Sequence, residues 1–194
     1  MKAGVVLLAA GRATRMGANK LVADLRGKPV LAHAVDAVTA AGLPPPIVVL
    51  GHEATATRAA VERRPACFVI APDHAEGIAR SLAAGIAAVP ADWDAAIVCL
   101  GDMPRLSPAL LRALAARARP DVVIVPCHEG VRGNPVLWGR AHFSRLAALR
   151  GDIGGRALLA GLGDAVVELD WGDDSVRVDL DTQAALAAER VRGG

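Results

Sequence analysis

The chain has 194 residues, of which 53% are hydrophobic and 22% are charged, and its formal net charge is +2. This length suits one ordinary domain with a full core, and the scattered arginines form no basic stripe of the kind that binds nucleic acid. The apolar runs are far shorter than the ~20 residues that cross a bilayer, and Met1-Lys2 leads into a strand pattern without a signal peptide. We therefore expect a single domain, 1–194, in the cytoplasm, with neither nucleic acid nor a membrane as partner.

Short apolar runs rich in β-branched residues predict buried strands, and Ala, Leu and Arg segments with helical spacing lie between them. Strand, helix and strand in regular order predict parallel strands with right-handed crossovers. The expected strands are Gly4–Leu8, Ile47–Leu50, Cys67–Ile70, Ala95–Leu100, Val122–Val125 and Ala165–Leu169. The expected helices are Leu31–Ala41, Ala54–Arg64, Ile78–Val89 and Pro108–Arg119.

After Val125 the regular alternation weakens. The stretch CHEGVRGNPVLWGR brings glycines, a proline and an aromatic residue into a loop-and-strand segment that we expect to lie over the sheet. Two short helices, a strand pair and a last helix complete the chain, at Ala141–Leu149, Gly155–Gly161, Ala165–Val178 and from Thr182. The sequence thus predicts an α/β fold, a Rossmann-like three-layer sandwich with a mostly parallel twisted sheet, whose ligands bind beyond the carboxyl ends of the strands.

The cysteines and histidines give no metal or disulfide signal. Cys67, Cys99 and Cys127 are an odd number of widely spaced thiols, each in or beside an apolar run, which indicates small core residues. The five histidines are equally dispersed, and none has zinc-ligand spacing. We expect His33 to pack within a helix.

The loop after the first strand reads LLAAGRATRMGANKL. It matches neither the dinucleotide fingerprint GxGxxG nor the P-loop GxxxxGK[ST]. The small residues Ala9, Ala10 and Gly11 let backbone N–H groups approach a ligand, and Arg15 and Lys20 add charge for phosphates. Lysine offers a compact ammonium on a flexible stem, which favours a role for Lys20 at phosphates in the transition state. The alternative is a tight strand-to-helix turn with a solvated face.

Two motifs that contain carboxylates stand further along the chain. GDMP places Asp102 at the end of an apolar strand, where it can hold the Mg²⁺ that bridges phosphate oxygens, although a plain turn is the alternative. DLDT places Asp179 and Asp181 on one face if a strand persists there. Asp181 is therefore either a second metal ligand or the N-cap of the terminal helix.

These residues resemble the signature of the nucleotidyltransferases that share the fold of the molybdenum cofactor guanylyl- and cytidylyltransferases, the MobA-like NTP transferases. Leu8 to Lys20 follows the pattern L-A-[AG]-G-x-S-x-R-M-G-x-x-K except at Ala13-Thr14, and GDMP follows G-D-[MQ]-P. The resemblance implies a nucleotide-diphospho-sugar transferase type of fold, with Mg²⁺ held by Asp102 and Asp181. It implies catalysis by Arg15, Lys20 and Asp102. The nucleotide-binding residues that it implies in this part of the chain are Leu8, Ala9, Ala10, Gly11, Arg15, Lys20 and Asp102.

Three later segments extend the resemblance. AEGIARSLAAGI resembles [EQ]-G-[ML]-x-x-S-L-x-x-G, which implies that Glu76, Gly77 and Ser81 contact the nucleotide, while Ser81 has an ordinary helix position as its alternative. RGNPVLWG and LRGDIGGRALL resemble G-x-P-[VL]-[LF]-[FW] and L-x-G-D-x-G-A-R of the molybdopterin branch. An ordinary helix start with a surface arginine is the alternative for the second segment. The acceptor-binding residues implied are Asn134, Asp152, Gly154 and Arg156.

The Ala9-Ala10-Gly11 form resembles the cytidylyl branch, whereas L-A-G-G is typical of the guanylyl branch. The resemblance implies Mg²⁺-dependent transfer of CMP from CTP to the phosphate of molybdenum-loaded molybdopterin. Residues about 1–105 would bind the nucleotide and about 126–182 the acceptor, and a molybdoenzyme maturation chaperone would receive the product. The alternatives are GTP as donor, another phosphorylated acceptor, or a nucleotide-binding carrier without turnover.

Overall fold

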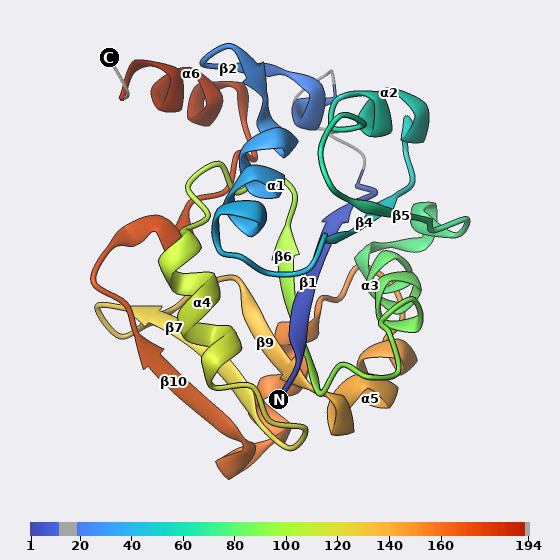
Figure 1. The fold of residues 1–194 in the computed structure, drawn as a ribbon, viewed down its shortest axis with the longest axis vertical. Helices are drawn as coiled ribbons and strands as arrows, with labels where there is room; N and C mark the ends of the chain where they lie inside the picture. The colour runs from blue at the N-terminus through green and yellow to red at the C-terminus, as the bar shows by residue number, and fades with distance from the viewer. Residues whose placement is uncertain (12–18, 193–194) are drawn as a thin grey trace.

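The computed structural model describes residues 1–11 and 19–192 (Figure 1). Its strands are β1 Ala3–Ala9, β2 Asp24–Leu25, β3 Lys28–Pro29, β4 Ile47–Leu50, β5 Cys67–Ile70, β6 Ala95–Leu100, β7 Val123–His128, β8 Val131–Arg132, β9 Val136–Gly139 and β10 Val166–Asp170. Its α-helices are α1 Val30–Ala40, α2 Ala54–Ala59, α3 Ile78–Ala87, α4 Pro108–Ala116, α5 Phe143–Ala148 and α6 Gln183–Val191. Short 3₁₀ turns lie at η1 Lys20–Val22, η2 His74–Glu76, η3 Arg140–His142, η4 Gly155–Gly161, η5 Gly163–Ala165 and η6 Asp174–Arg177.

The centre of the described structure is an eight-stranded sheet in the order β10-β7-β9-β6-β1-β4-β5, with β8 paired to β7. β1 runs parallel to β4 and β6, β4 to β5, and β7 to β10. β9 runs antiparallel to β6 and β7, because the chain returns from β7 through β8 without a crossover helix. The expectation of a mostly parallel α/β sheet is confirmed, and β9 is the exception to strictly parallel pairing.

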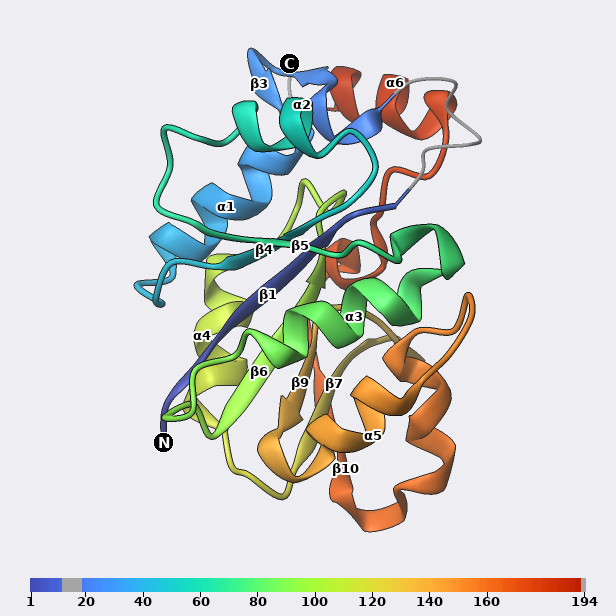
Figure 2. The same ribbon diagram turned by 90° about the vertical axis from the view of Figure 1, so that its right-hand side faces the viewer.

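Helices cover both faces of this sheet (Figures 1 and 2). α1 and α4 pack on one face, and α3 and α5 pack on the other, which is turned toward the viewer in Figure 2. The alternating side chains of β1 serve both layers, since Val5 and Leu7 belong to the first core cluster and Val6 to the second, all fully buried. The three-layer sandwich expected from the sequence is therefore the observed architecture.

Both edge strands of the sheet, β5 and β10, depart from the expectation that every strand is buried, since neither contains a buried residue. Cys67 is exposed and Ile70 is 57% exposed, whereas Cys99 and Cys127 are buried as expected. β5 pairs with β4 alone, so its outer side lacks a neighbouring strand. Cys67 is thus a surface residue, and its assignment to the core is wrong.

The later part of the chain differs from prediction in the type of its elements. Gly155–Gly161 forms a 3₁₀ helix, and the strand pair expected within Ala165–Val178 is one strand, β10, followed by η6. The carboxylate of Asp173 accepts a hydrogen bond from the Ser175 N–H at 2.9 Å. This cap starts a helical turn at the place where a second strand would have begun.

After η6 the chain returns to the carboxyl end of β6 and ends in α6. The Leu180 N–H donates to the Asp102 carbonyl at 3.1 Å. Leu180 also packs with Leu25, Val30 and Leu186 in a small core of its own. The C-terminal helix is therefore fixed to the β2–β3 hairpin and to the turn that follows β6.

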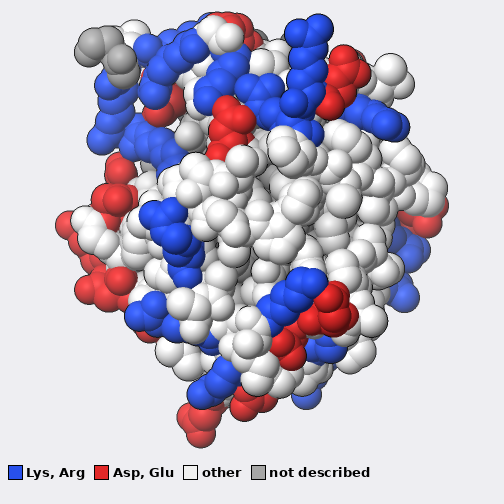
Figure 3. Space-filling model, viewed as in Figure 1, with Lys and Arg blue, Asp and Glu red and all other residues white. Residues whose placement is uncertain are grey.

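On the face drawn in Figure 3, the basic side chains are concentrated at one end of the molecule. Lys and Arg gather at the top of that view, over α6, β2 and α2, with acidic side chains among them. Arg26 and Lys28 of the β2–β3 hairpin pair with Glu189 and Asp36. Among the described residues, no helix combines the length and the apolar character that crossing a membrane demands, and the cytoplasmic location stays a prediction.

Candidate active site at the carboxyl ends of β1 and β6

The turn after β6 is held against the end of β1. The Gly101 N–H donates to the Leu8 carbonyl at 2.9 Å, and a Cβ on Gly101 would stand 3.1 Å from that oxygen and from a methyl of Leu31. A glycine therefore lets the turn lie close to the neighbouring strand. Asp102 follows directly and is only 6% exposed.

Lys20 lies between two carboxylates that come from distant parts of the chain. Its ammonium forms an ion pair with Asp102 and another with Asp181, the second with Nζ and Oδ1 2.9 Å apart. Burial alone would lower the pKa of Lys20, but the charges and hydrogen bonds of both carboxylates outweigh it and raise that pKa. The cluster of Lys20, Asp102 and Asp181 thus holds a charged ammonium at the strand ends.

The segment before α6 resolves one of the alternatives. Thr182 is the N-cap of α6, since its Oγ1 accepts from the Ala185 N–H at 3.1 Å, so the assignment of this cap to Asp181 is wrong. The strand expected through Asp179 and Asp181 is absent, and the two residues line different cavities. Burial, and then the charges of Asp102 and Asp181, raise the pKa of Asp179.

A cavity of about 570 Å³, which we call the first cavity, opens at this cluster. Ala9 instead packs in the core on the side of α1 and α4, and does not line it. Arg15 lies outside the described residues. The predicted nucleotide-binding and metal-binding residues that do line the first cavity are Leu8, Ala10, Gly11, Lys20, Glu76, Gly77, Ser81, Asp102 and Asp181.

The start of α3 forms one wall of the first cavity. Gly77 has φ +118°, and a Cβ there would stand 2.6 Å from the Asp152 amide nitrogen. Oδ1 of Asp152 accepts from the Ile78 N–H at 3.4 Å, so this carboxylate faces the N-terminus of α3. Asp152 does not cap its own helix, because the N-cap of η4 is Gly154. Glu76 forms an ion pair with Arg80 at 2.6 Å.

A second cavity, of about 490 Å³, adjoins the first. It contains all four predicted acceptor-binding residues, and its apolar lining includes Trp138 and Leu82. The predicted residues are Asn134, Asp152, Gly154 and Arg156. The wall common to both cavities consists of Leu8, Ile78, Leu100 and Asp152. Ligands in the two cavities would therefore meet at this wall.

A smaller pocket of about 210 Å³ continues from the second cavity, with which it shares Asn134, Arg156 and Asp179. Arg132 and Arg177 also line it. Nε of Arg132 donates to Glu168 at 2.7 Å, and the Arg156 guanidinium donates to the Arg132 carbonyl. The far end of the second cavity is thus rich in guanidinium groups.

Some lining residues escaped the sequence analysis. His74 borders the first cavity, and its Nδ1 lies 3.0 Å from the Ala71 carbonyl oxygen. A Cβ on Gly51 would stand 2.6 Å from the His74 ring, so this glycine makes room for the histidine. A single histidine in a loop has no motif spacing from which its position at the cavity could have been predicted. Asp179 stood in a recognised motif, but only the fold shows which cavity it borders.

The donor set of the first cavity fits a hard divalent cation. Asp102 and Asp181 supply carboxylate oxygens, and Mg²⁺ in nucleotide sites takes one or two carboxylates together with phosphate and water. Within the described ranges, no group of three or more His, Cys, Asp or Glu residues is placed to hold a metal. A cation here would take its remaining contacts from water and, when a nucleotide is bound, from phosphate oxygens.

Fold and site together define an α/β protein with charged groups gathered beside a cavity of about 570 Å³ at the ends of the strands. Residues 5–166 match the model of the MobA-like NTP transferase domain. The chain therefore belongs to the family of MobA-like NTP transferase domains.

Solved structures agree with this assignment. Rv0371c from Mycobacterium tuberculosis H37Rv is 30% identical and covers 98% of this chain and 97% of its own, with a TM-score of 0.89. A structure of Rv0371c in complex with manganese is 28% identical over the whole of both chains, with a TM-score of 0.85. A nucleotidyl transferase from Methanothermobacter thermautotroptrophicus is 26% identical over 98% of this chain and 97% of its own, with a TM-score of 0.85.

Curated relatives are more varied. The bifunctional protein GlmU of Heliobacterium modesticaldum is 36% identical over 120 residues, which are 58% of this chain. The chain spans about a quarter of that protein's length, since the match covers 25% of it. Nicotine blue oxidoreductase of Paenarthrobacter nicotinovorans is 28% identical over 186 residues, 91% of each chain.

Proposed function

We propose that this nucleotidyltransferase moves CMP from CTP to the phosphate of molybdenum-loaded molybdopterin and releases pyrophosphate. The observation that carries the proposal is the placing of Lys20, Asp102 and Asp181 at the first cavity, which shares a wall with a second cavity lined by Asn134 and Arg156. Two adjoining cavities suit a reaction that joins two substrates.

In this proposal Asp102 and Asp181 hold Mg²⁺, which when bound offsets the negative charge of the triphosphate. Lys20, kept protonated by its carboxylate partners, donates to phosphate oxygens as their charge grows. An oxygen of the acceptor phosphate forms the new bond to the α-phosphorus, and the bond to the β-phosphate oxygen breaks with departure of pyrophosphate. The acceptor is already an anion, so positioning and charge stabilisation suffice without a covalent protein intermediate.

The acceptor is assigned to the second cavity. Arg156 can pair with an anionic group, and the backbone at Gly154 can approach it closely. Residues about 1–105 then serve the nucleotide and about 126–182 serve the acceptor, within one domain spanning 1–194. Hand-over of the product to a molybdoenzyme maturation chaperone belongs to the same proposal.

The choice of CTP rests on the resemblance of Ala9-Ala10-Gly11 to the cytidylyl branch. GTP as donor, another phosphorylated acceptor, and a nucleotide-binding carrier without turnover are the competing assignments. An oxidoreductase reaction is a further candidate, favoured by one observation: the match to nicotine blue oxidoreductase covers 91% of both chains. The charged cluster at the first cavity, which suits a phosphate-bearing ligand, argues against an oxidoreductase reaction.

The deciding experiment measures pyrophosphate release from CTP and from GTP with Mg²⁺, using molybdopterin obtained from a molybdoenzyme. Release with CTP that requires the acceptor and is lost in Asp102→Ala supports the proposal. Release of pyrophosphate from GTP but not from CTP would assign GTP as the donor. Binding of CTP without release in the presence of acceptor would favour the carrier.

A further inference from the structure

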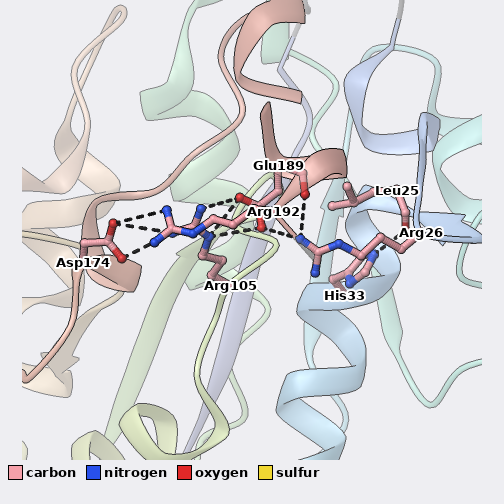
Figure 4. A network of polar contacts seen from close by, with 7 residues as sticks. All are labelled: Leu25, Arg26, His33, Arg105, Asp174, Glu189 and Arg192. Carbon is pink, nitrogen blue, oxygen red and sulfur yellow. Dashed lines mark hydrogen bonds and ion pairs between the residues drawn. The ribbon is translucent and has the colours of Figure 1, made fainter. Parts of the chain in front are cut away.

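Glu189, on the inner side of the C-terminal helix α6, is a buried carboxylate outside the three cavities (Figure 4). Its side chain is 5% exposed. Nε of Arg105 donates to its Oε2 at 2.9 Å, and Nη2 of Arg105 donates to the same oxygen at 2.5 Å. Nη2 of Arg26 donates to Oε1 at 2.9 Å and to the Glu189 backbone carbonyl at 2.7 Å. Two arginines thus converge on one carboxylate.

The positions of these residues along the chain match those of the charged cluster. Arg26 lies six residues after Lys20, between β2 and β3. Arg105 lies three residues after Asp102, in the turn that follows β6. Glu189 itself lies eight residues after Asp181, on the helix that Asp181 precedes. Each of the three segments that supply the cluster therefore also supplies one member of the Glu189 network.

Hydrogen bonds connect the segments that carry the Lys20, Asp102 and Asp181 cluster with those that carry the Glu189 network. The Leu180 N–H donates to the Asp102 carbonyl, and the Arg190 guanidinium donates to the Asp24 carbonyl at 2.7 and 3.0 Å. Arg105 also reaches Asp174 with N and O 3.3 Å apart. A change at Glu189 would therefore be transmitted to the cluster through a few short, hydrogen-bonded stretches of chain.

We propose that Glu189 is a positioning residue that fixes the separation of Lys20, Asp102 and Asp181, and so sets the affinity of the first cavity for a divalent cation. It touches no substrate and acts through Arg26 and Arg105. The link to turnover rests on the proposed function, whereas the link to metal affinity is measured on the protein alone.

The test compares Glu189→Gln with a matched control, Asp36→Asn, in the full chain. Asp36 also receives two basic partners, Lys28 at 2.6 Å and Arg64 at 2.7 Å, but it joins neither the Asp102 nor the Asp181 segment. Mn²⁺ binding is followed by titration calorimetry, well below the melting temperature of each variant. We expect Mn²⁺ affinity to fall about tenfold in Glu189→Gln, the range seen when groups that orient metal ligands are removed, and to change less than about twofold in the control.

Two further measurements extend this test, and comparing the melting temperature with the Mn²⁺ affinity of each variant separates positioning from a merely structural role. Amide exchange at Leu180 should be faster in Glu189→Gln and unchanged in Asp36→Asn. If Glu189→Gln unfolds, Arg105→Lys, which keeps the charge and loses the two-pronged contact, should show the same weakening of Mn²⁺ binding to a smaller degree. A variant that melts earlier yet binds Mn²⁺ as tightly as the unchanged protein would overturn the proposal.

The proposed function can fail independently of this result. Tight Mn²⁺ binding that is lost in Glu189→Gln, in a protein that releases no pyrophosphate, would support the positioning role and refute the transfer reaction. In a protein that does turn over, the Mg²⁺ concentration for half-maximal rate should rise about tenfold in Glu189→Gln while the acceptor KM stays constant.

Discussion

The first and second cavities share a wall, yet their remaining walls are built differently. At the first, Asp102 is buried at the end of a core strand and Lys20 is ion-paired with two carboxylates. At the second, Arg156 is exposed and lies in the 3₁₀ turn η4, outside the sheet. The end of a core strand thus fixes Asp102 of the first cavity, whereas Arg156 of the second lies on a surface turn whose sequence can vary at less cost to the fold.

The sharpest test of this contrast is Lys20→Ala, set against Lys28→Ala. Loss of the ammonium at the first cavity should lower the rate of pyrophosphate release about 10²- to 10³-fold, as removal of one preorganised donor does in other enzymes. Lys28, which pairs with Asp36 away from the cavities, should change the rate little. Equal rates for the two variants would remove Lys20 from the catalytic proposal.

For the second cavity the matched pair is Arg156→Ala and Arg145→Ala. Hydrogen bonds to charged groups contribute about 1.5–3 kcal/mol, so loss of Arg156 should raise the acceptor KM about ten- to hundredfold. The KM for CTP should stay unchanged, because Arg156 does not line the first cavity. Arg145 is an exposed residue of α5 that lines none of the three cavities. A rise in both KM values would show that the cavities are not independent.

The packing beside the shared wall can be probed at Gly77, which lies against the backbone of Asp152. Gly77→Ala should lower the free energy of unfolding by about 2–3 kcal/mol, since the new methyl is strained at φ +118° and stands against the backbone of residues 151–152. Gly42→Ala, at φ +71° with open space around its Cβ, should cost about 1 kcal/mol. Urea unfolding of both variants gives the comparison. Equal losses would mean that the close approach of the two loops is unimportant.

The smallest expected effect concerns acid. Hydrogen bonds from Arg105 lower the pKa of Glu189, so its stabilisation is complete above the ordinary glutamate value near 4.3 and is lost as the pH falls through the lowered pKa. The unchanged protein should exceed Glu189→Gln by about 1.5 kcal/mol in unfolding free energy at pH 7, and the difference should begin to narrow as the pH falls below about 4.

Glu168→Gln is the control for this measurement, because Glu168 pairs with Arg132 on the exposed strand β10. Such surface pairs contribute little, so its unfolding curve should follow that of the unchanged protein across the pH range. A gap for Glu189→Gln that persists unchanged at low pH would assign the difference to packing and not to charge.

The sequence predicted the first half of the fold closely, since β4, β5 and β6 have the bounds expected from their apolar runs. It failed where burial depends on neighbours, as at Cys67, because a run of apolar residues does not reveal whether its strand lies at the edge. It also failed after β10, where the Asp173 cap starts a helical turn in place of the second strand that hydrophobicity alone suggested.

For the candidate site, the residue types and the resemblance to the family pattern were enough to predict Lys20, Asp102 and Asp181 as site residues. The Glu189 network had no such signal. Arg26, Arg105 and Glu189 are ordinary charged residues in sequence, and their association depends on the path by which α6 returns to the sheet. Long-range ion pairs of this kind follow from topology and not from local patterns.

The wall formed by Leu8, Ile78, Leu100 and Asp152 affects the release of a product as well as the encounter of two substrates. A molecule that fills both cavities is attached at two ends, so that when one end lets go the other keeps it nearby and recapture competes with escape. The product of the proposed reaction is such a two-ended molecule. Its departure, rather than the joining step, would then limit turnover, and a recipient protein that takes hold of the freed end would speed the cycle.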